Sequence, residues 1–211
     1  MKVSFNKIRF STIIWIGIVV AGLLIGFSLL MSNIKDSYDE KVMDYRRQKN
    51  QYFKTSEDSP IPDKVNFTGL NYFEPDKKYQ VKAEISLLDD TIPLSILRSD
   101  GRKDDYSRYA LATFMLDDKE YNLVLLKHEN EAEPNVLFIP FADKTNGESS
   151  YGGGRYIDLK YKNTSDKITI DFNFCYNPFC AYNYKYSCPI PPKENFLDIE
   201  IPAGEKTFKS N

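Results

Sequence analysis

Hydrophobic residues follow two different patterns along this chain, and the change between them separates a helical N-terminal part from a β-rich remainder. Residues 11–32 form an apolar run without one charged side chain. From residue 79 onward apolar and polar residues alternate, as in YQVKAEISLL. An unbroken apolar run of this length is typical of a membrane-spanning helix, whereas a period of two is typical of half-buried strands.

The apolar run is long enough to cross a bilayer, because twenty-odd helical residues span about 30 Å. Lys2, Lys7 and Arg9 precede it, and the segment after it carries both signs of charge. This asymmetry predicts a single-pass protein with a cytoplasmic N-terminus and a periplasmic or extracellular remainder. The alternative is a cleaved signal peptide, but its apolar region is usually only about 7–15 residues long. We therefore predict an uncleaved signal anchor in the inner membrane.

A second, amphipathic helix is predicted directly after the anchor. Its apolar and aromatic residues recur at helical spacing, and the Ser59-Pro60-Ile61-Pro62 segment ends the pattern. The stripe consists of Tyr38, Val42, Tyr45, Tyr52 and Phe53. It either packs on the following domain or faces a partner or the membrane surface. We divide the chain into a cytoplasmic N-terminus with its anchor (1–35), an amphipathic helix or linker (36–58) and an extracytoplasmic β-domain (59–211).

Short segments with strand-like alternation fill the third part, separated by turn residues. Their ranges are 79–88, 91–97, 108–116, 119–128, 134–141, 155–162, 166–174 and 195–202. Asp117-Asp118 is expected to join two of them as a hairpin. Short strands at about 10-residue spacing, without helices between them, predict a mainly β fold, either an antiparallel sandwich or a barrel-like domain.

Charge and histidine content exclude several functions. The net charge is −2, so the chain lacks the basic field that nucleic-acid binding usually needs. It has 15 Tyr and 14 Phe but a single histidine, His128. A Cys–His or Ser–His catalytic pair, or a Cys3His zinc site, would depend on that residue. We therefore predict neither a metal nor another cofactor, and we expect HENEAEPN (128–135) to be a solvated acidic loop.

The first candidate site is the glycine-rich stretch SSYGGGRYIDL. Three successive glycines (152–154) occur where a chain needs positive φ or a close approach, and their N–H groups can bind an anion. Arg155 adds a guanidinium fork that fits a carboxylate or phosphate. No Gly-Lys-Ser/Thr follows, so this is not a P-loop. The alternative is a tight turn whose arginine bonds to nearby carbonyls or to Asp143.

Carboxylates offer a second chemistry. Asp143 either forms part of the turn FADKTNGES or acts as a functional carboxylate. Together with Asp158, Asp171 and Glu194 it could form a spatial pair for acid–base catalysis. Asp143 and Asp171 are therefore the catalytic candidates of an alternative hypothesis, a hydrolase-type enzyme.

All three cysteines lie in DFNFCYNPFCAYNYKYSCPIPPKEN (171–195). Three is an odd number, so at least one thiol is left over or pairs between chains. We predict a Cys180–Cys188 disulfide that closes a short loop and contributes about 2–3 kcal/mol, with Cys175 free. In the same stretch, amide and phenol side chains either face a ligand or cap the backbone.

Several motifs occur in a familiar order. They are Gly69-Leu70 with Tyr72-Phe73, Pro140-Phe141 with Asp143, Thr145 and Gly147, Tyr151 to Tyr156, Asp171-Phe172-Asn173, Tyr176-Asn177-Pro178 with Cys180-Ala181-Tyr182, Cys188-Pro189 with Pro191-Pro192 and Glu194-Asn195, and Ala203 to Lys206. Over residues 40–208 the chain resembles the bacterial family called domain of unknown function 1684. The resemblance implies that these polar groups converge in space, but no established activity. Cys175 departs from the family pattern, which supports pairing the other two cysteines.

The leading hypothesis is a membrane-anchored binding module for a small polar or anionic ligand. The predicted ligand contacts are Tyr151, Gly152, Gly153, Gly154, Arg155, Tyr156, Asp171, Asn173, Tyr176, Asn177 and Asn195. A third hypothesis is a cell-envelope assembly subunit that binds an envelope protein through the amphipathic helix and an apolar sheet face. The expected partners are thus the inner membrane and either a small ligand or an envelope protein, with no nucleic acid.

Overall fold

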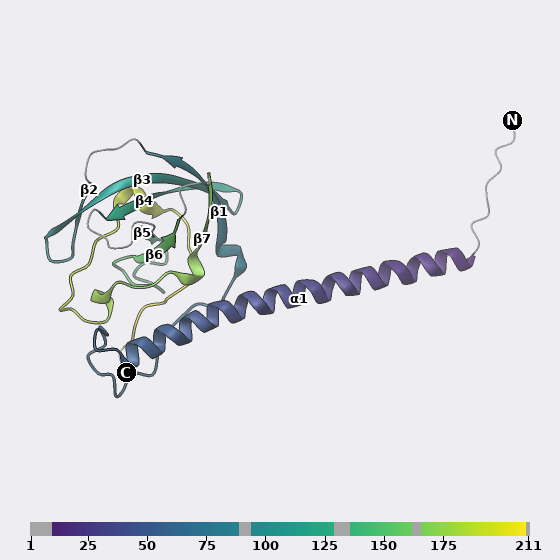
Figure 1. Cartoon of the computed structure of the whole chain (residues 1–211), viewed down its shortest axis with the longest axis horizontal. Coiled ribbons are helices and arrows are strands. Elements are labelled where there is room, and N and C mark those ends of the chain that lie inside the picture. Colours follow the sequence, from purple (N-terminus) through teal and green to yellow (C-terminus); the bar gives the residue numbers. More distant parts are fainter. Residues whose placement is uncertain (1–9, 89–93, 129–135, 162–165, 210–211) are drawn as a thin grey trace. The chain divides into compact units, whose positions relative to one another are not determined.

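A computed structural model gives the structure of residues 10–88, 94–128, 136–161 and 166–209. Its longest element is α1 (Phe10–Thr55), which continues without a break through both predicted helices. No glycine or proline occurs between Phe27 and Thr55, so the sequence contains nothing to interrupt the helix between them. The prediction of two separate helices was therefore wrong (Figure 1).

The chain forms two compact units, Met1–Lys41 and Val42–Asn211, and α1 contributes to both. Within the described residues, α1 is the one helix whose length and composition would allow it to cross a membrane. Its most apolar 18-residue window has a mean hydropathy of 2.2, and none of that window is buried. An N-terminal signal sequence would meet the same criteria. The last turns of α1, from Val42, belong with the β-domain.

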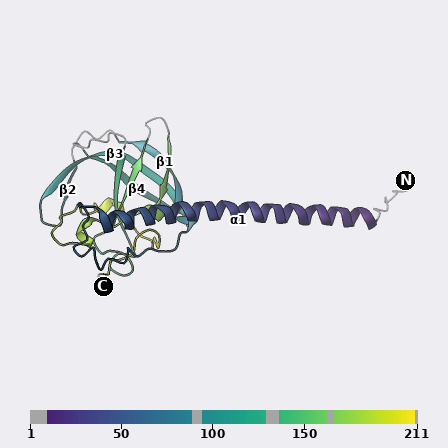
Figure 2. The ribbon, with the colours of Figure 1, turned by 60° about the horizontal axis from the view of Figure 1, so that its bottom comes forward.

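The β-domain is built on one curved, mainly antiparallel sheet. Its strands are β1 (Gln80–Leu87), β2 (Leu94–Leu97), β3 (Lys103–Leu116), β4 (Lys119–His128), β5 (Val136–Asp143), β6 (Arg155–Lys160), β7 (Lys167–Asp171) and β8 (Phe196–Leu197). The strand order is β6-β5-β4-β3-β1-β7, with β2 beside β3 and β8 parallel to β5. Figure 2 shows the bend of the sheet across β2, β3, β4 and β1. The mainly antiparallel β fold is confirmed, but the strands form a half-barrel rather than the two sheets of a sandwich.

Local sequence explains most strand boundaries. Asp117 and Asp118 both have positive φ (50° and 58°), the backbone of a tight hairpin turn between β3 and β4. β3 begins five residues earlier than predicted, because Lys103–Tyr106 pair with β2. The predicted strand 195–202 shrinks to β8. The predicted acidic loop beyond His128 and residues 91–93 lie outside the described residues.

Within the described residues, four short 3-10 helices occur, one directly before β1 and three between β7 and β8. They are η1 (Lys77–Tyr79), η2 (Phe172–Phe174), η3 (Phe179–Ala181) and η4 (Lys193–Asn195). The main hydrophobic core lies between the sheet and the segments that contain η2 and residues 197–203. Its fully buried members include Leu123, Leu125, Ile139, Phe141, Ile170, Phe172 and Ile201.

A second cluster fixes the end of α1 to the β-domain. Phe53 is 2% exposed and packs with Ile61, Phe67, Leu70 and Tyr182. Its ring makes an edge contact with Tyr182 at 5.1 Å between centroids. Phe53 and Tyr45, whose ring lies 5.1 Å from that of Phe174, are two residues of the predicted stripe that do pack on the domain.

Removal of this aromatic anchor tests the second cluster. We expect Phe53→Ala to lower the free energy of unfolding by about 3–5 kcal/mol, because it leaves a cavity in a packed cluster. Tyr52→Ala is the matched control, since its side chain is 43% exposed, and it should cost less than about 1 kcal/mol. Denaturant unfolding of both variants measures the difference. Equal losses would show that the cluster does not fasten the helix.

Candidate functional site

A buried ion pair occupies the place where the anion site was predicted. Arg155 begins β6 and Asp143 ends β5, and both side chains are 0% exposed. Arg155 Nη2 lies 2.6 Å from Asp143 Oδ2. The guanidinium also donates to the carbonyls of Ala203 (2.5 Å) and Ile201 (2.8 Å). Arg155 therefore bonds inside the protein, and a ligand in solution cannot reach it in this conformation.

Asp143 is equally occupied. Its Oδ1 accepts the backbone N–H groups of Thr145 (2.8 Å) and Ile201 (3.2 Å), and its Oδ2 accepts from Arg155. A buried carboxylate with these three donors is held as an acceptor and has no path to a substrate. The geometry therefore supports the structural alternative for this pair, and the catalytic role of Asp143 has no support from it.

The last glycine of the glycine loop is also explained by packing inside the protein. Gly154 has φ +90°, and a Cβ there would lie 2.4 Å from Pro191 Cγ and 2.8 Å from the carbonyl oxygen of Phe141. Any side chain at this position would therefore clash with the segment that follows Cys188. Gly152 and Gly153 are exposed, so anion binding by their N–H groups stays a prediction.

Asp171 and Asn173 cap and connect backbone segments. Asp171 Oδ1 accepts the N–H of Asn173 at 3.1 Å and so begins η2. Asp171 Oδ2 accepts from Gln80 at 2.9 Å. The amide of Asn173 makes two bonds to the backbone of Asp76, one with its oxygen (2.9 Å) and one with its nitrogen (2.8 Å). These side chains hold β7 and the segment before η1 together.

Two further predicted contacts, Asn195 and Asn177, are fully buried. Asn195 bonds to the backbone of β4 at Val124 through both its amide oxygen (2.7 Å) and nitrogen (3.0 Å), and it also donates to the carbonyl of Pro140 (2.8 Å). Asn177 Nδ2 donates to Glu205 Oε1 at 3.0 Å. Asn195 thus links β4 and β5, and neither residue is open to solvent.

The sequence analysis did not identify Glu205, a carboxylate that bonds to several segments of the protein. Glu205 is 0% exposed and accepts bonds from Tyr182, from Asn177 and from Lys49 Nζ (3.2 Å). Lys49 lies on α1, 156 residues away in sequence. The available clues were the Ala203 to Lys206 motif and the position of Lys49 on the helix, four residues after Tyr45 and three before Tyr52.

Next to this network lies an open groove with a volume of about 520 Å³, which we call the aromatic groove. Its lining residues are Tyr45, Gln48, Lys49, Tyr52, Phe53, Asp158, Tyr176 and Phe179. Tyr176 OH donates to Asp158 Oδ2 at 2.6 Å, and Lys49 Nζ lies 4.3 Å from the centre of the Tyr176 ring. Of the predicted ligand contacts, Tyr176 is the one that lines this groove.

The phenols of Tyr45 and Tyr176 are neutral donors. Burial raises the pKa of Tyr45 above its ordinary value, and the charge of Glu205 raises it further. Burial, followed by the charge of Asp158, raises the pKa of Tyr176 well above its ordinary value. The net pKa of Asp158 is raised as well. Desolvation by neighbouring side chains raises it by more than the hydrogen bond from Tyr176 and the positive charge of Lys49 lower it. Asp158 is exposed, and no described residue donates to its Oδ1.

All three cysteines are free thiols in this structure, with Cys175 in the main core. Cys180 and Cys188 lie side by side, and Tyr151 OH is 3.6 Å from Cys180 Sγ. Tyr156 OH donates to the carbonyl of Pro189. The predicted disulfide stays a prediction. The described part of the chain contains no group of three His, Cys, Asp or Glu side chains that could hold a metal ion.

Comparisons with known proteins match the part of the chain that contains most of these residues. The family model "Protein of unknown function (DUF1684)" matches residues 65–206, which confirms the resemblance. The solution NMR structure of an uncharacterized protein from Haloarcula marismortui is similar to this chain, with a TM-score of 0.65 and 37% sequence identity. The similarity covers 83% of this chain and 97% of the other. No curated protein matches this chain.

The buried ion pair makes a stability prediction. Arg155→Ala leaves Asp143 buried without its cation, and we expect the free energy of unfolding to fall by about 3–5 kcal/mol. Arg102→Ala is the control, because it breaks an exposed pair with Asp100 (69% and 36% exposed) and should cost less than about 1 kcal/mol. Denaturant unfolding measures both. An Arg155→Ala protein as stable as the control would mean that the pair does not hold the domain together.

Proposed function

Because the chain belongs to the DUF1684 family of proteins of unknown function, we propose its function from its own geometry: it is a membrane-anchored protein whose β-domain binds a small polar ligand in the aromatic groove. The observation that carries this proposal is the groove itself. Its volume of about 520 Å³ lies within the range of small-molecule sites, which are typically lined by aromatic side chains with a few polar groups.

The charges in the groove favour a neutral ligand over an anion. The ammonium of Lys49 is already paired with Glu205, so little of its charge is left for a ligand. The carboxylate of Asp158 would repel an anion and accept hydroxyl groups through Oδ1. Rings such as Tyr52, which is 43% exposed, offer apolar faces beside it. A compound with several hydroxyl groups and an apolar face, such as a sugar, fits this combination best.

Membrane anchoring is the second part of the proposal. The apolar run 11–32 and the preceding Lys2, Lys7 and Arg9 support a span with the N-terminus in the cytoplasm. The β-domain would then lie on the other side of the inner membrane, in the periplasm or outside the cell, where it could meet envelope sugars.

The enzyme hypothesis is less well supported than binding. Its two catalytic candidates bond within the protein, Asp143 to Arg155 and Asp171 to Gln80. Neither lines the aromatic groove.

A ligand screen on the full-length protein in detergent tests the groove. Sugars, polyols and small anions are added separately, and the unfolding temperature is followed, because a ligand that binds the native state raises it. We expect a sugar or polyol to stabilise the protein. We expect Asp158→Asn to weaken that ligand by about 10- to 100-fold in Kd, since it removes a charge-assisted bond.

Asp198→Asn is the matched control, because this carboxylate is also exposed but bonds to Lys144 and Lys119 away from the groove. Its ligand affinity should equal that of the wild type. Stabilisation by anions alone would contradict the assigned ligand class. No stabilisation by any compound would count against a small-molecule site and favour the assembly hypothesis.

Arginine residues introduced into the apolar run test the proposed membrane anchor. Leu23→Arg with Leu24→Arg places two charges in the middle of the proposed span, where each costs about 2.5–3.5 kcal/mol. We expect the variant to leave the membrane fraction after carbonate extraction, while Met43→Arg, on the same helix beyond the run, stays in it. Equal membrane retention of both variants would contradict anchoring by residues 11–32.

A further inference from the structure

Two cysteines of unequal exposure lie in contact at the ends of one loop. The backbone N–H of Cys180 donates to Cys188 Sγ at 3.3 Å, so the two residues are in direct contact. Cys180 is partly exposed, whereas Cys188 is buried. A small molecule can therefore reach the first sulfur but not readily the second.

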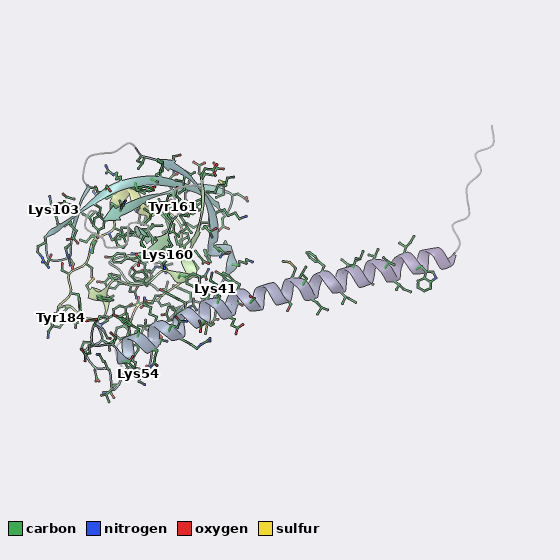
Figure 3. All side chains as sticks on the ribbon, in the orientation of Figure 1. Lys41, Lys54, Lys103, Lys160, Tyr161 and Tyr184 are labelled. Carbon is green, nitrogen blue, oxygen red and sulfur yellow. The ribbon has the colours of Figure 1, made fainter. Side chains whose placement is uncertain are left out.

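Both cysteines are held from outside the loop. The carbonyl of Cys188 accepts from Ser99 N–H at 3.0 Å, and Cys188 N–H donates to Ser99 Oγ at 3.3 Å, so the β2–β3 turn fixes this residue. Cys180 lies in η3, directly after the segment in which Asn177 bonds to Glu205. The loop between them reaches into solvent, with Tyr184 90% exposed (Figure 3).

The contact also makes the two sulfurs chemically unequal. The neighbouring thiol of Cys188 lowers the pKa of Cys180 to about 6, and the contact with Tyr151 OH contributes to that shift. The same contact with Cys180, together with burial, raises the pKa of Cys188 above its ordinary value. The contact thus favours the thiolate at the accessible sulfur and the protonated thiol at the buried one. A thiolate is the nucleophilic form of cysteine.

We propose that Cys180 and Cys188 form a redox-active dithiol, in which Cys180 attacks a low-molecular-weight disulfide and Cys188 resolves the product. In the first step the Cys180 thiolate forms a bond to one sulfur of the small disulfide, and the other sulfur leaves as a thiolate. Cys188 then gives up its proton to solvent and attacks Cys180, which releases the second small thiolate. Two protein thiols are oxidised to a disulfide, and one small disulfide is reduced to two thiols.

The dithiol chemistry does not depend on ligand binding in the aromatic groove, although Cys180 lies next to a residue that lines it. Phe179 precedes Cys180 in η3 and lines the aromatic groove. A Cys180–Cys188 bond would therefore tie one wall of the groove to the β2–β3 turn.

The first experiment measures the alkylation rate of Cys180 in the reduced full-length protein between pH 4.5 and 10, using iodoacetamide and peptide mass spectrometry. Trypsin cleaves at Lys185 and so separates Cys180 from Cys188. We expect a midpoint near pH 6 in the wild type. Cys188→Ser keeps a hydroxyl donor and should stay within about one pH unit of it. Cys188→Ala removes the donor and should move the midpoint toward about 8.5, the value of a free cysteine.

The second experiment incubates the protein with glutathione disulfide at pH 7. We expect the wild type to form the Cys180–Cys188 disulfide, and Cys188→Ser to accumulate glutathione on Cys180. Buried Cys175 should stay unmodified in both and serves as the internal reference.

Either of two results would overturn the proposal. One is a wild-type midpoint near pH 8.5. The other is a wild-type protein that keeps glutathione on Cys180 without forming the internal bond. Should Cys188→Ala fail to fold, as checked by circular dichroism, the comparison of wild type with Cys188→Ser still decides between these outcomes.

Discussion

The buried pair of Arg155 and Asp143 is the interaction on which the C-terminal half depends. Residues 201–205 follow β8 outside the regular strands, and side-chain bonds add to a few backbone bonds, such as that from Glu205 N–H to the carbonyl of Cys175. Asp143 accepts the N–H of Ile201, and Arg155 donates to the carbonyls of Ile201 and Ala203. These bonds set the position of Glu205, which in turn receives Lys49 from α1. The ion pair thereby helps to fix the C-terminal segment that carries Glu205, the partner of Lys49 on α1.

The chemistry of arginine explains why this residue type is suited to the position. A charge without solvent is tolerated only when several partners surround it, because desolvation costs several kcal/mol per ion. A planar guanidinium can bond to a carboxylate and to two carbonyls at once, whereas a lysine ammonium would present three donors from a single atom. The flat fork also packs beside the ring of Phe141, whose centre lies 5.3 Å from Arg155 Cζ.

Alternation of apolar and polar residues was enough to predict most of the strands, because every second residue of a half-buried strand faces the core. β4 begins and ends where the pattern does, and Asp117-Asp118 forms the predicted turn. Curvature could not be predicted. It depends on β3 pairing with β2 at one end and with β1 at the other, and the sequence does not state which strands pair.

The candidate site shows a different limit. The sequence drew attention to residues that do meet in space, yet a motif of polar residues has the same letters whether it binds a ligand or holds the fold. From the sequence alone, Asn195 and Arg155 could be ligand contacts. Both are fully buried in the folded protein, so they bond to other parts of the chain instead. Lys49 and Glu205 were missed for the opposite reason. A charged residue on a helix is ordinarily solvated, and nothing local indicates a partner 156 residues away.

Cys175 gives the protein a built-in reporter of its own opening. Its sulfur donates to the carbonyl of Ala203 at 3.4 Å, and a Cβ on Gly204 would come within 2.3 Å of it, so no reagent fits beside it. Burial also raises the pKa of this thiol to about 11, which keeps it protonated. A thiol without room or charge reacts only while the surrounding core is open. The labelling rate of Cys175 therefore follows the opening of the core in the native state, and the free energy of that opening can be measured without denaturant or an introduced cysteine.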